Sequence, residues 1–135
     1  MDVFKKIIDG EIPSKKIYED DYCIAILDLN PFRKGHSLVI SKECKATIEE
    51  LDSTTLSHMI NAASLISKEM RDALNADDTN VLINNGPAAG QEIPHVHMHV
   101  IPRFEKDGPL FGIEKQKYED GEMELYREKL TLIKG

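Results

Sequence analysis

The chain has few cysteines. Cys23 and Cys44 are the only two among its 135 residues, and they do not form a Cys-x-x-Cys motif. Disulfide-stabilised domains and thiolate zinc sites need more cysteines at closer spacing, so the sequence indicates neither. Reduced thiols are typical of a cytoplasmic protein, and we expect this compartment.

Positive charge is also scarce. Seventeen Lys and Arg residues stand against 24 Asp and Glu, for a formal net charge of −7. Binding to a nucleic-acid backbone relies on clustered Lys and Arg, so we expect no nucleic-acid partner. A single nucleotide held in a local pocket is still compatible with this composition.

Long apolar runs are missing as well. No run approaches the roughly 20 apolar residues that a membrane-spanning helix needs. Residues 1–6 also lack the basic and apolar regions of a secretory signal. We therefore expect no membrane association.

The length and composition predict one globular domain. Hydrophobic residues make up 41% of the chain and charged residues 30%. A chain of this length can bury one core but is too short for two ordinary domains. We expect a single domain over residues 1–135, with its core at about 3–104 and a C-terminal tail at 105–135.

Hydrophobic periodicity predicts the α+β class, with an antiparallel sheet, one long helix and a short N-terminal helix. The expected helices cover residues 4–8, 54–74 and 122–133. The expected strands cover residues 16–19, 22–29, 36–40, 79–83 and 94–102.

Two predicted helices have apolar positions that indicate a buried face. In the long helix these are Leu56, Met59, Ile60, Ala63, Ile66, Met70, Ala73 and Leu74. In the terminal helix they are Leu125, Leu130 and Ile133. His58 lies off the centre of the long helix's apolar stripe, and we expect it at the surface.

The most informative feature is a row of three alternating histidines. His95, His97 and His99 are separated by single apolar residues, which is the period-two pattern of a half-buried strand. Side chains two residues apart on a strand project from the same face, about 6.5–7 Å apart. The three imidazoles are therefore expected on the face opposite the core contacts.

Three readings of this row are possible from the residues alone. The imidazoles could coordinate Zn²⁺ with an open position for water, divide the work of covalent catalysis, or be satisfied polar groups at a sheet edge. The preceding segment 86–91 offers backbone amides and the Gln91 side chain, which suit a phosphate. Glu92 is the nearby carboxylate, and in an unbroken strand it would face away from the imidazoles.

The histidine row resembles the signature of the histidine-triad (HIT) family, His-φ-His-φ-His-φ-φ with φ apolar. The resemblance also includes segments 4–8, 12–13, 28–31, 35–40, 89–91 and 102–103. Its character is closest to the Hint-like branch of nucleotide hydrolases. It implies a HIT-like fold and a homodimer whose sheets continue across the interface.

The resemblance also implies roles for individual histidines. His97 would attack the α-phosphate and carry a nucleotidyl group. His99 would donate to the phosphoryl oxygens or to the leaving group, and His95 would hold the row in place. His36 would line the site from a neighbouring strand.

Substrate-binding residues follow from the same resemblance. Gln91 would hydrogen-bond the α-phosphate region, Asn84 would lie beside the phosphates, and Asp28 would bind the ribose hydroxyls. An apolar nucleobase slot would be formed by Val3, Phe4, Ile7, Ile26, Leu29 and Leu38. The apolar residues would also suit a core, and Asp28 would also suit the turn before Asn30-Pro31.

Three departures from the family pattern have consequences. Many relatives bind structural zinc through a Cys-x-x-Cys motif, but residues 2–5 read Asp-Val-Phe-Lys, so we expect no metal. Glu92 replaces a small hydroxyl residue and would repel phosphate if it faced the site. The tail beyond Phe104, which can shape leaving-group specificity in the family, matches little.

These observations predict an enzyme without cofactor or metal. The expected reaction is hydrolysis of a purine nucleotide derivative, a phosphoramidate or phosphoanhydride, through a nucleotidyl-histidine intermediate that releases a nucleoside monophosphate. The alternatives are a dinucleoside polyphosphate hydrolase, which Pro102-Arg103 favours, and a nucleotide-binding protein with little turnover.

Overall fold

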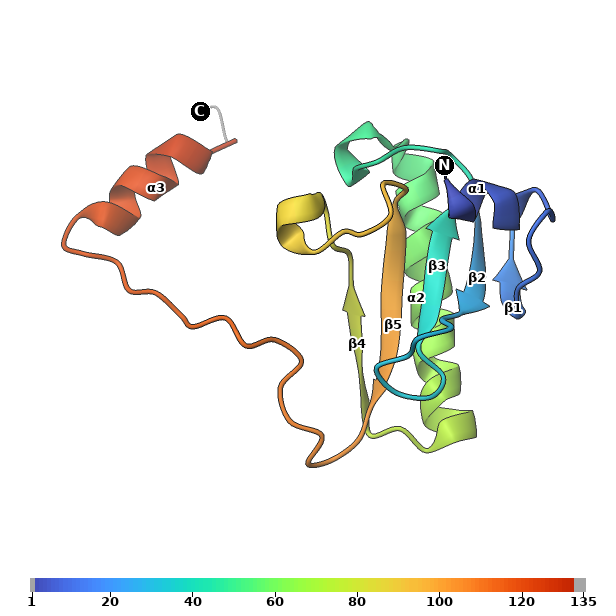
Figure 1. The fold of residues 1–135 in the computed structure, drawn as a ribbon. Helices are drawn as coiled ribbons and strands as arrows, with labels where there is room; N and C mark the ends of the chain where they lie inside the picture. Colours follow the sequence, from blue (N-terminus) through green and yellow to red (C-terminus); the bar gives the residue numbers. More distant parts are fainter. Residues whose placement is uncertain (1, 133–135) are drawn as a thin grey trace.

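The computed structural model describes residues 2–132, in which one antiparallel sheet lies against a long helix (Figure 1). The helices are α1 (Val3–Ile8), α2 (Ser53–Leu74) and α3 (Glu122–Leu130), with short 3₁₀ turns η1 (Ile48–Glu50) and η2 (Pro87–Ala89). The strands are β1 (Lys16–Glu19), β2 (Cys23–Leu27), β3 (Ser37–Ser41), β4 (Asp78–Leu82) and β5 (His97–Arg103). The predicted α+β class is confirmed.

The sheet order brings distant segments together. The strands follow the order β1-β2-β3-β5-β4, and every neighbouring pair is antiparallel. In this register Leu38 of β3 lies opposite Ile26 of β2 on one side and opposite His99 of β5 on the other. The sheet therefore places the histidine strand beside the apolar strand β3, which pairs with β2 on its other side.

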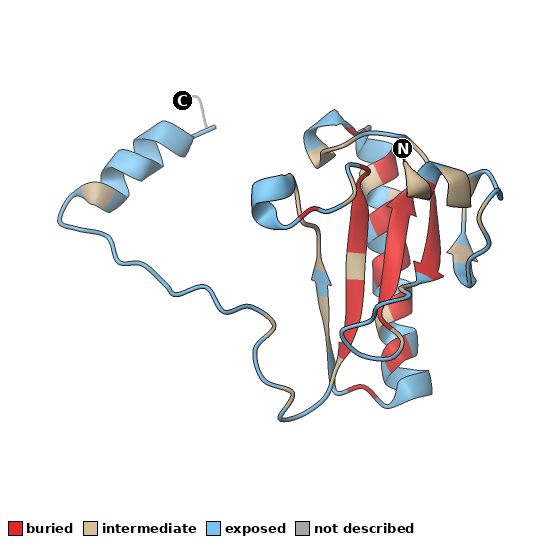
Figure 2. Cartoon of the chain, in the orientation of Figure 1, coloured by how far each residue is buried: buried red, intermediate tan, exposed pale blue. Residues whose placement is uncertain are grey.

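The two faces of the sheet have different cores, because successive side chains alternate between them. One face packs against α2 through the cluster that includes Cys23, Ala25, Val39, Val96, Met98 and Val100. The other face packs against α1 through Phe4 with Ile24, Ile26, Leu38 and Ile40. Figure 2 shows the buried residues concentrated in α2 and in the three central strands.

Helix α2 has a capping residue at each end. Asp52 accepts a hydrogen bond from the backbone N–H of Thr54 at 2.8 Å, and Asn75 ends the helix in the left-handed conformation, with a φ of 56°. The predicted buried face was wrong at Ile60 and Leu74, which are 51% and 44% exposed, and at Ala73, which is also exposed. A helix on a sheet buries only one stripe, and these residues lie on its flanks.

The predicted histidine strand begins too early. Strand β5 starts at His97 instead of Pro94, because the backbone N–H groups of the two residues before His97 bond outside the sheet. The backbone N–H of His95 donates to the carbonyl of Ile93, and that of Val96 donates to Lys45. His95 therefore lies in the turn that leads into the strand.

Gly35 lies at a turn that positions the next histidine. Its φ is +99°, and a Cβ placed there would lie 2.7 Å from Cδ1 of Leu74. The turn is closed by hydrogen bonds from the N–H of His36 to the carbonyl of Arg33 and from the N–H of Asp28 to the carbonyl of His36. A glycine suits this position because it tolerates the positive φ and places no Cβ against Leu74.

The C-terminal arm leads away from the sheet and ends in α3 (Figure 1). The expected contact residues of this helix were wrong, since Leu125 and Leu130 are 56% and 73% exposed. Ile133, the third of them, lies outside the described residues. Across residues 2–132, no helix has the length and apolar character needed to cross a membrane.

Candidate active site

A cavity of about 480 Å³ opens on the α1 face of the sheet. All but two of the predicted site residues line it. They are Val3, Phe4, Ile7, Ile26, Asp28, Leu29, His36, Leu38, Asn84, His97 and His99. The cavity thus has a mostly apolar wall and a polar wall that carries three imidazoles.

His97 is held in one tautomer. Its Nδ1 atom lies 2.7 Å from the backbone carbonyl oxygen of His95, which can only accept a hydrogen bond. The hydrogen therefore lies on Nδ1, and Nε2 keeps its lone pair. Burial lowers the pKa of His97, which favours the neutral ring. A buried neutral imidazole with one free nitrogen is suited to nucleophilic attack.

His99 is held in the opposite tautomer by His36. The backbone N–H of Phe32 donates to Nδ1 of His36 at 3.2 Å, which leaves the hydrogen of that ring on Nε2. This atom lies 2.9 Å from Nδ1 of His99, so His36 donates and His99 accepts. The hydrogen of His99 must then lie on Nε2, where it can be donated to a ligand.

Both rings of this pair favour the neutral state. Burial, together with the neighbouring rings of His97 and His36, lowers the pKa of His99 to about 4, although the Asp28 carboxylate opposes this shift. Burial also lowers the pKa of His36, although the Asp28 carboxylate 3.6 Å away opposes this effect. The three cavity histidines therefore remain uncharged near neutral pH.

Asp28 stabilises the predicted turn and also lines the cavity. One carboxylate oxygen accepts a hydrogen bond from the N–H of Asn30 at 2.8 Å and so stabilises the turn. The other lies near Nε2 of His36, and the residue lines the cavity. The turn thus holds the carboxylate at the cavity, where it is placed to meet ligand hydroxyls.

His95 and Gln91 are the two predicted residues that do not line the cavity. The ring of His95 is fully buried, between Asp2 and the backbone of Ser41. The Gln91 side chain accepts from the N–H of Gly86 and donates to the carbonyl of Ala46, both at 2.7 Å. Gln91 therefore stabilises the turn before β5, and its contact with phosphate remains an expectation.

Several cavity residues were not predicted as part of the site. Phe32 stacks on His36, with ring centroids 5.6 Å apart and an angle of 18° between the planes. Glu92 lines the cavity because residues before His97 are not in a strand, so the alternation used for its orientation does not apply. The proline at position 94 is the sequence signal that could have indicated this break.

One group of cavity side chains has the composition of a metal site. Asp28, His36 and His99 bring one ligand atom each within 4.8 Å of one another. However, Nε2 of His36 carries a hydrogen, and Nδ1 of His99 accepts it. A metal ion would have to break this hydrogen bond and displace that hydrogen, so the group fits a hydrogen-bonded array better than a cation.

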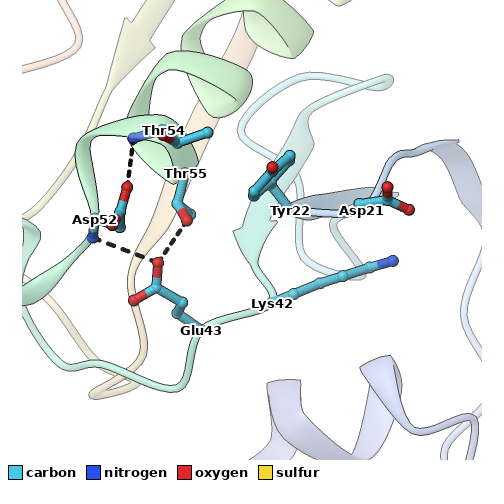
Figure 3. A pocket seen from close by; sticks show the side chains of 7 residues that line it. All are labelled: Asp21, Tyr22, Lys42, Glu43, Asp52, Thr54 and Thr55. Carbon is cyan, nitrogen blue, oxygen red and sulfur yellow. Dashed lines mark hydrogen bonds between the residues drawn. The ribbon is translucent and has the colours of Figure 1, made fainter.

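A second hollow of about 480 Å³ lies near the N-terminus of α2 (Figure 3). Its polar groups are largely bonded to one another. Glu43 accepts from the Thr55 hydroxyl at 2.5 Å and from the backbone N–H of Asp52 at 3.4 Å. Asp52 itself caps the helix. These groups stabilise the start of α2, and the hollow contains no histidine.

Comparisons with known proteins identify the family of this chain. A family model described as HIT domain matches residues 9–106. Adenylylsulfatase HINT3 of Arabidopsis thaliana is 50% identical over 105 residues, which is 78% of this chain and 53% of that protein. The chain thus spans about half of that relative. Adenosine 5'-monophosphoramidase HNT1 of Saccharomyces cerevisiae is 38% identical over 135 residues, covering 98% and 83% of the two chains.

Solved structures show the same fold. A HIT family protein from Bacillus subtilis has a TM-score of 0.86 at 34% identity, covering 96% of this chain and 94% of its own. A Zn-bound histidine triad family protein from Mycobacterium smegmatis has a TM-score of 0.75 at 39% identity, covering 78% and 76% of the two chains.

Proposed function

The chain belongs to the HIT family, and on that premise we propose that it hydrolyses adenylyl derivatives, phosphoramidates or mixed anhydrides, to release AMP. The observation that carries this proposal is the geometry of His97, a neutral buried ring whose Nδ1–H is held by the carbonyl of His95. Relatives named adenylylsulfatase and adenosine 5'-monophosphoramidase support the adenylyl group as the common part of the substrate.

In the first step, Nε2 of His97 attacks the α-phosphorus. A P–N bond forms, and the bond from phosphorus to the leaving group breaks. The leaving group departs with the electron pair, and an amine leaving group takes up a proton from water. The Nε2–H of His99 donates to a phosphoryl oxygen, where charge develops in the transition state.

In the second step, water attacks the same phosphorus. A P–O bond forms, the bond from phosphorus to Nε2 breaks, and the electron pair returns to His97. The water gives up a proton to the solvent, which balances the one taken by an amine leaving group. The products are AMP and the regenerated neutral imidazole.

The cavity accounts for recognition of the rest of the nucleotide. Asp28 is assigned to the ribose hydroxyls, because a carboxylate accepts two hydrogen bonds from adjacent hydroxyls. The apolar wall is assigned to the base and is formed by Val3, Phe4, Ile7, Ile26 and Leu38. Asn84 is assigned to the phosphates beside the imidazoles.

The proposal is tested by intact mass spectrometry after brief mixing with adenosine 5′-phosphoramidate at mildly acid pH. The wild type is expected to gain one adenylyl group, and His97→Ala is expected to gain none. His58→Ala is the matched control, since this exposed histidine lies outside the cavity and should form the adduct. AMP binding without adduct or turnover would instead indicate a nucleotide-binding protein.

The dinucleoside polyphosphate alternative loses its support in the structure. Arg103, the residue that favoured it, donates to Asn80 at 2.6 Å and to the carbonyl of Gly108 at 2.5 Å. The guanidinium thus holds the end of β5 and the following loop, and it does not line the cavity.

We also propose a homodimer joined through the outer edge of the sheet. Strand β4 is a sheet edge next to the histidine strand, and its Val81 is 41% exposed. Unpaired backbone groups on an edge strand can pair with those of a second copy. Sedimentation of the wild type should show a dimer, and Val81→Lys should shift the population toward monomer.

A further inference from the structure

The fully buried ring of His95 has an acceptor at each nitrogen. Its Nε2 lies 2.7 Å from the carbonyl oxygen of Ser41, and its Nδ1 lies 2.5 Å from a carboxylate oxygen of Asp2. A carbonyl oxygen accepts only, so Nε2 must carry a hydrogen. An ionised carboxylate also accepts only, so Nδ1 then carries the second hydrogen. The pair is a carboxylate and an imidazolium.

Asp2 favours the ionised state in this position. Burial alone would raise the pKa of Asp2, but the hydrogen bond and charge of His95, with the backbone N–H groups of Lys5 and Phe4, lower it. Removing one partner of a buried charged pair is unfavourable, because the other charge is left without compensation. The two residues therefore hold each other in place.

The second carboxylate oxygen of Asp2 connects the pair to the cavity wall. It accepts from the N–H of Phe4 at 3.0 Å and from that of Lys5 at 3.3 Å, and so caps α1. The Phe4 ring contacts His97 edge to face, with centroids 4.8 Å apart. One carboxylate thus joins the first turn of α1 to the residue whose carbonyl holds the His97 tautomer.

The same place is where a family zinc site would be expected, and the residues do not fit one. Asp2, Cys44 and His95 bring ligand atoms within 4.8 Å of one another. Two ligands of a tetrahedral zinc ion lie about 3.3 Å apart, from bonds of about 2.0–2.1 Å, whereas Asp2 and His95 are in hydrogen-bond contact. A closed structural site also needs a fourth ligand, and the second cysteine of the motif is replaced by Lys5.

We propose that Asp2 is a positioning residue, which holds the catalytic His97 through its charged pair with His95 and makes a metal unnecessary there. This inference deepens the proposed function and rests on it for its kinetic part. Asp2 touches neither the cavity nor the reacting atoms, so its effect is transmitted through the backbone carbonyl of His95 to the Nδ1–H of His97.

The first experiment observes the rings directly. In ¹⁵N NMR spectra of the wild type, both ring nitrogens of His95 should carry hydrogen, and His97 should be a single Nδ1–H tautomer. In Asp2→Asn, the amide can still cap α1, but His95 should become neutral. In Asp2→Ser, the hydroxyl can cap α1 but cannot reach His95, and His97 should become a mixture of tautomers.

The second experiment measures kinetics with adenosine 5′-phosphoramidate. Asp2→Ser should lower kcat about tenfold or more, with KM changed much less, by analogy with partners that orient active-site histidines. Asp2→Asn should fall between Asp2→Ser and the wild type. Asp52→Ser is the matched control, because Asp52 caps α2 in the same way and lies away from the cavity.

Three outcomes would overturn the inference. They are a neutral His95 in the wild type, an unchanged His97 tautomer and kcat in Asp2→Ser, or a stoichiometric metal whose removal by a chelator lowers the thermal stability. If the wild type forms no adduct at all, the proposed function fails. The NMR spectra and metal content then still decide whether Asp2 holds the two rings.

Discussion

His36 donates its Nε2–H to Nδ1 of His99 across 2.9 Å, so a residue just before strand β3 determines the tautomer of a residue in the neighbouring strand β5. The two rings come from positions 63 residues apart in the chain. The hydrogen that His99 offers to a ligand therefore depends on a ring that is itself held by the backbone N–H of Phe32.

This relationship predicts different effects for two substitutions of His36. His36→Gln keeps an N–H that can reach His99, whereas His36→Leu removes it. We expect the leucine variant to lose about 10²-fold in kcat/KM, as for other losses of a positioned proton donor, and the glutamine variant to lose less. Steady-state kinetics with adenosine 5′-phosphoramidate provide the measurement. Equal losses in both variants would contradict the role of the donated hydrogen.

The buried His99 predicts a stability that depends on pH. Its pKa is lowered to about 4 by burial and by the neighbouring rings. In the unfolded chain a histidine protonates near pH 6.5, so between these values the unfolded state binds a proton that the folded state does not. The free energy of unfolding should therefore be fully present above about pH 6.5 and fall by about 3 kcal/mol as the pH approaches 4.

Urea unfolding at several pH values between 4 and 7 measures this slope. His99→Asn cannot take up the proton, so its slope should be shallower than that of the wild type. The comparison between the two proteins removes the contribution of the carboxylates that titrate in the same range. Parallel slopes would mean that His99 is not the group responsible.

The turn at Gly35 predicts a local cost of adding one methyl group. Gly35→Ala should lower the free energy of unfolding by about 1–3 kcal/mol, because its φ is positive and the new Cβ would meet Leu74. Gly112→Ala is the control, since its backbone is ordinary and nothing lies within 4 Å of a Cβ there. Chemical denaturation of both variants measures the difference, and similar values would argue against the close approach.

The two cysteines are predicted to differ in reactivity. Cys23 is fully buried, and burial with the nearby Asp20 carboxylate raises the pKa of its thiol to about 12. Cys44 is exposed. Because the thiolate is the reactive form, brief alkylation of the folded protein at neutral pH should modify Cys44 alone. Peptide mass spectrometry identifies the modified site, and labelling in denaturant should reach both.

Much of this site could be predicted because its residues carry local signals. The alternation of the triad with apolar residues predicted which side chains share a face, and His97 and His99 do line one cavity. The position of His95 could not be read in this way, because it depends on the turn before β5 and on Asp2, which is distant in the chain.

Other features depend on packing that a local pattern does not contain. Gln91 lies in a segment typical of phosphate binding, yet its amide bonds to Gly86 and Ala46. On the flanks of α2, Ile60 and Leu74 are apolar but exposed. Hydrophobic periodicity predicts the direction of the buried stripe but not its width. The stacking of Phe32 on His36 requires the tertiary turn itself.

Strand β5 combines two tasks in one register. Val96 just before this strand and Met98 and Val100 within it belong to the α2 core, while His97 and His99 face the cavity on the other side. Inserting or deleting a single residue here would exchange the two sets, burying imidazoles under α2 and exposing the core residues to substrate. Folding and catalysis in this segment therefore depend on the same alternation of side chains. A sequence change that shifts this alternation would disrupt both at once.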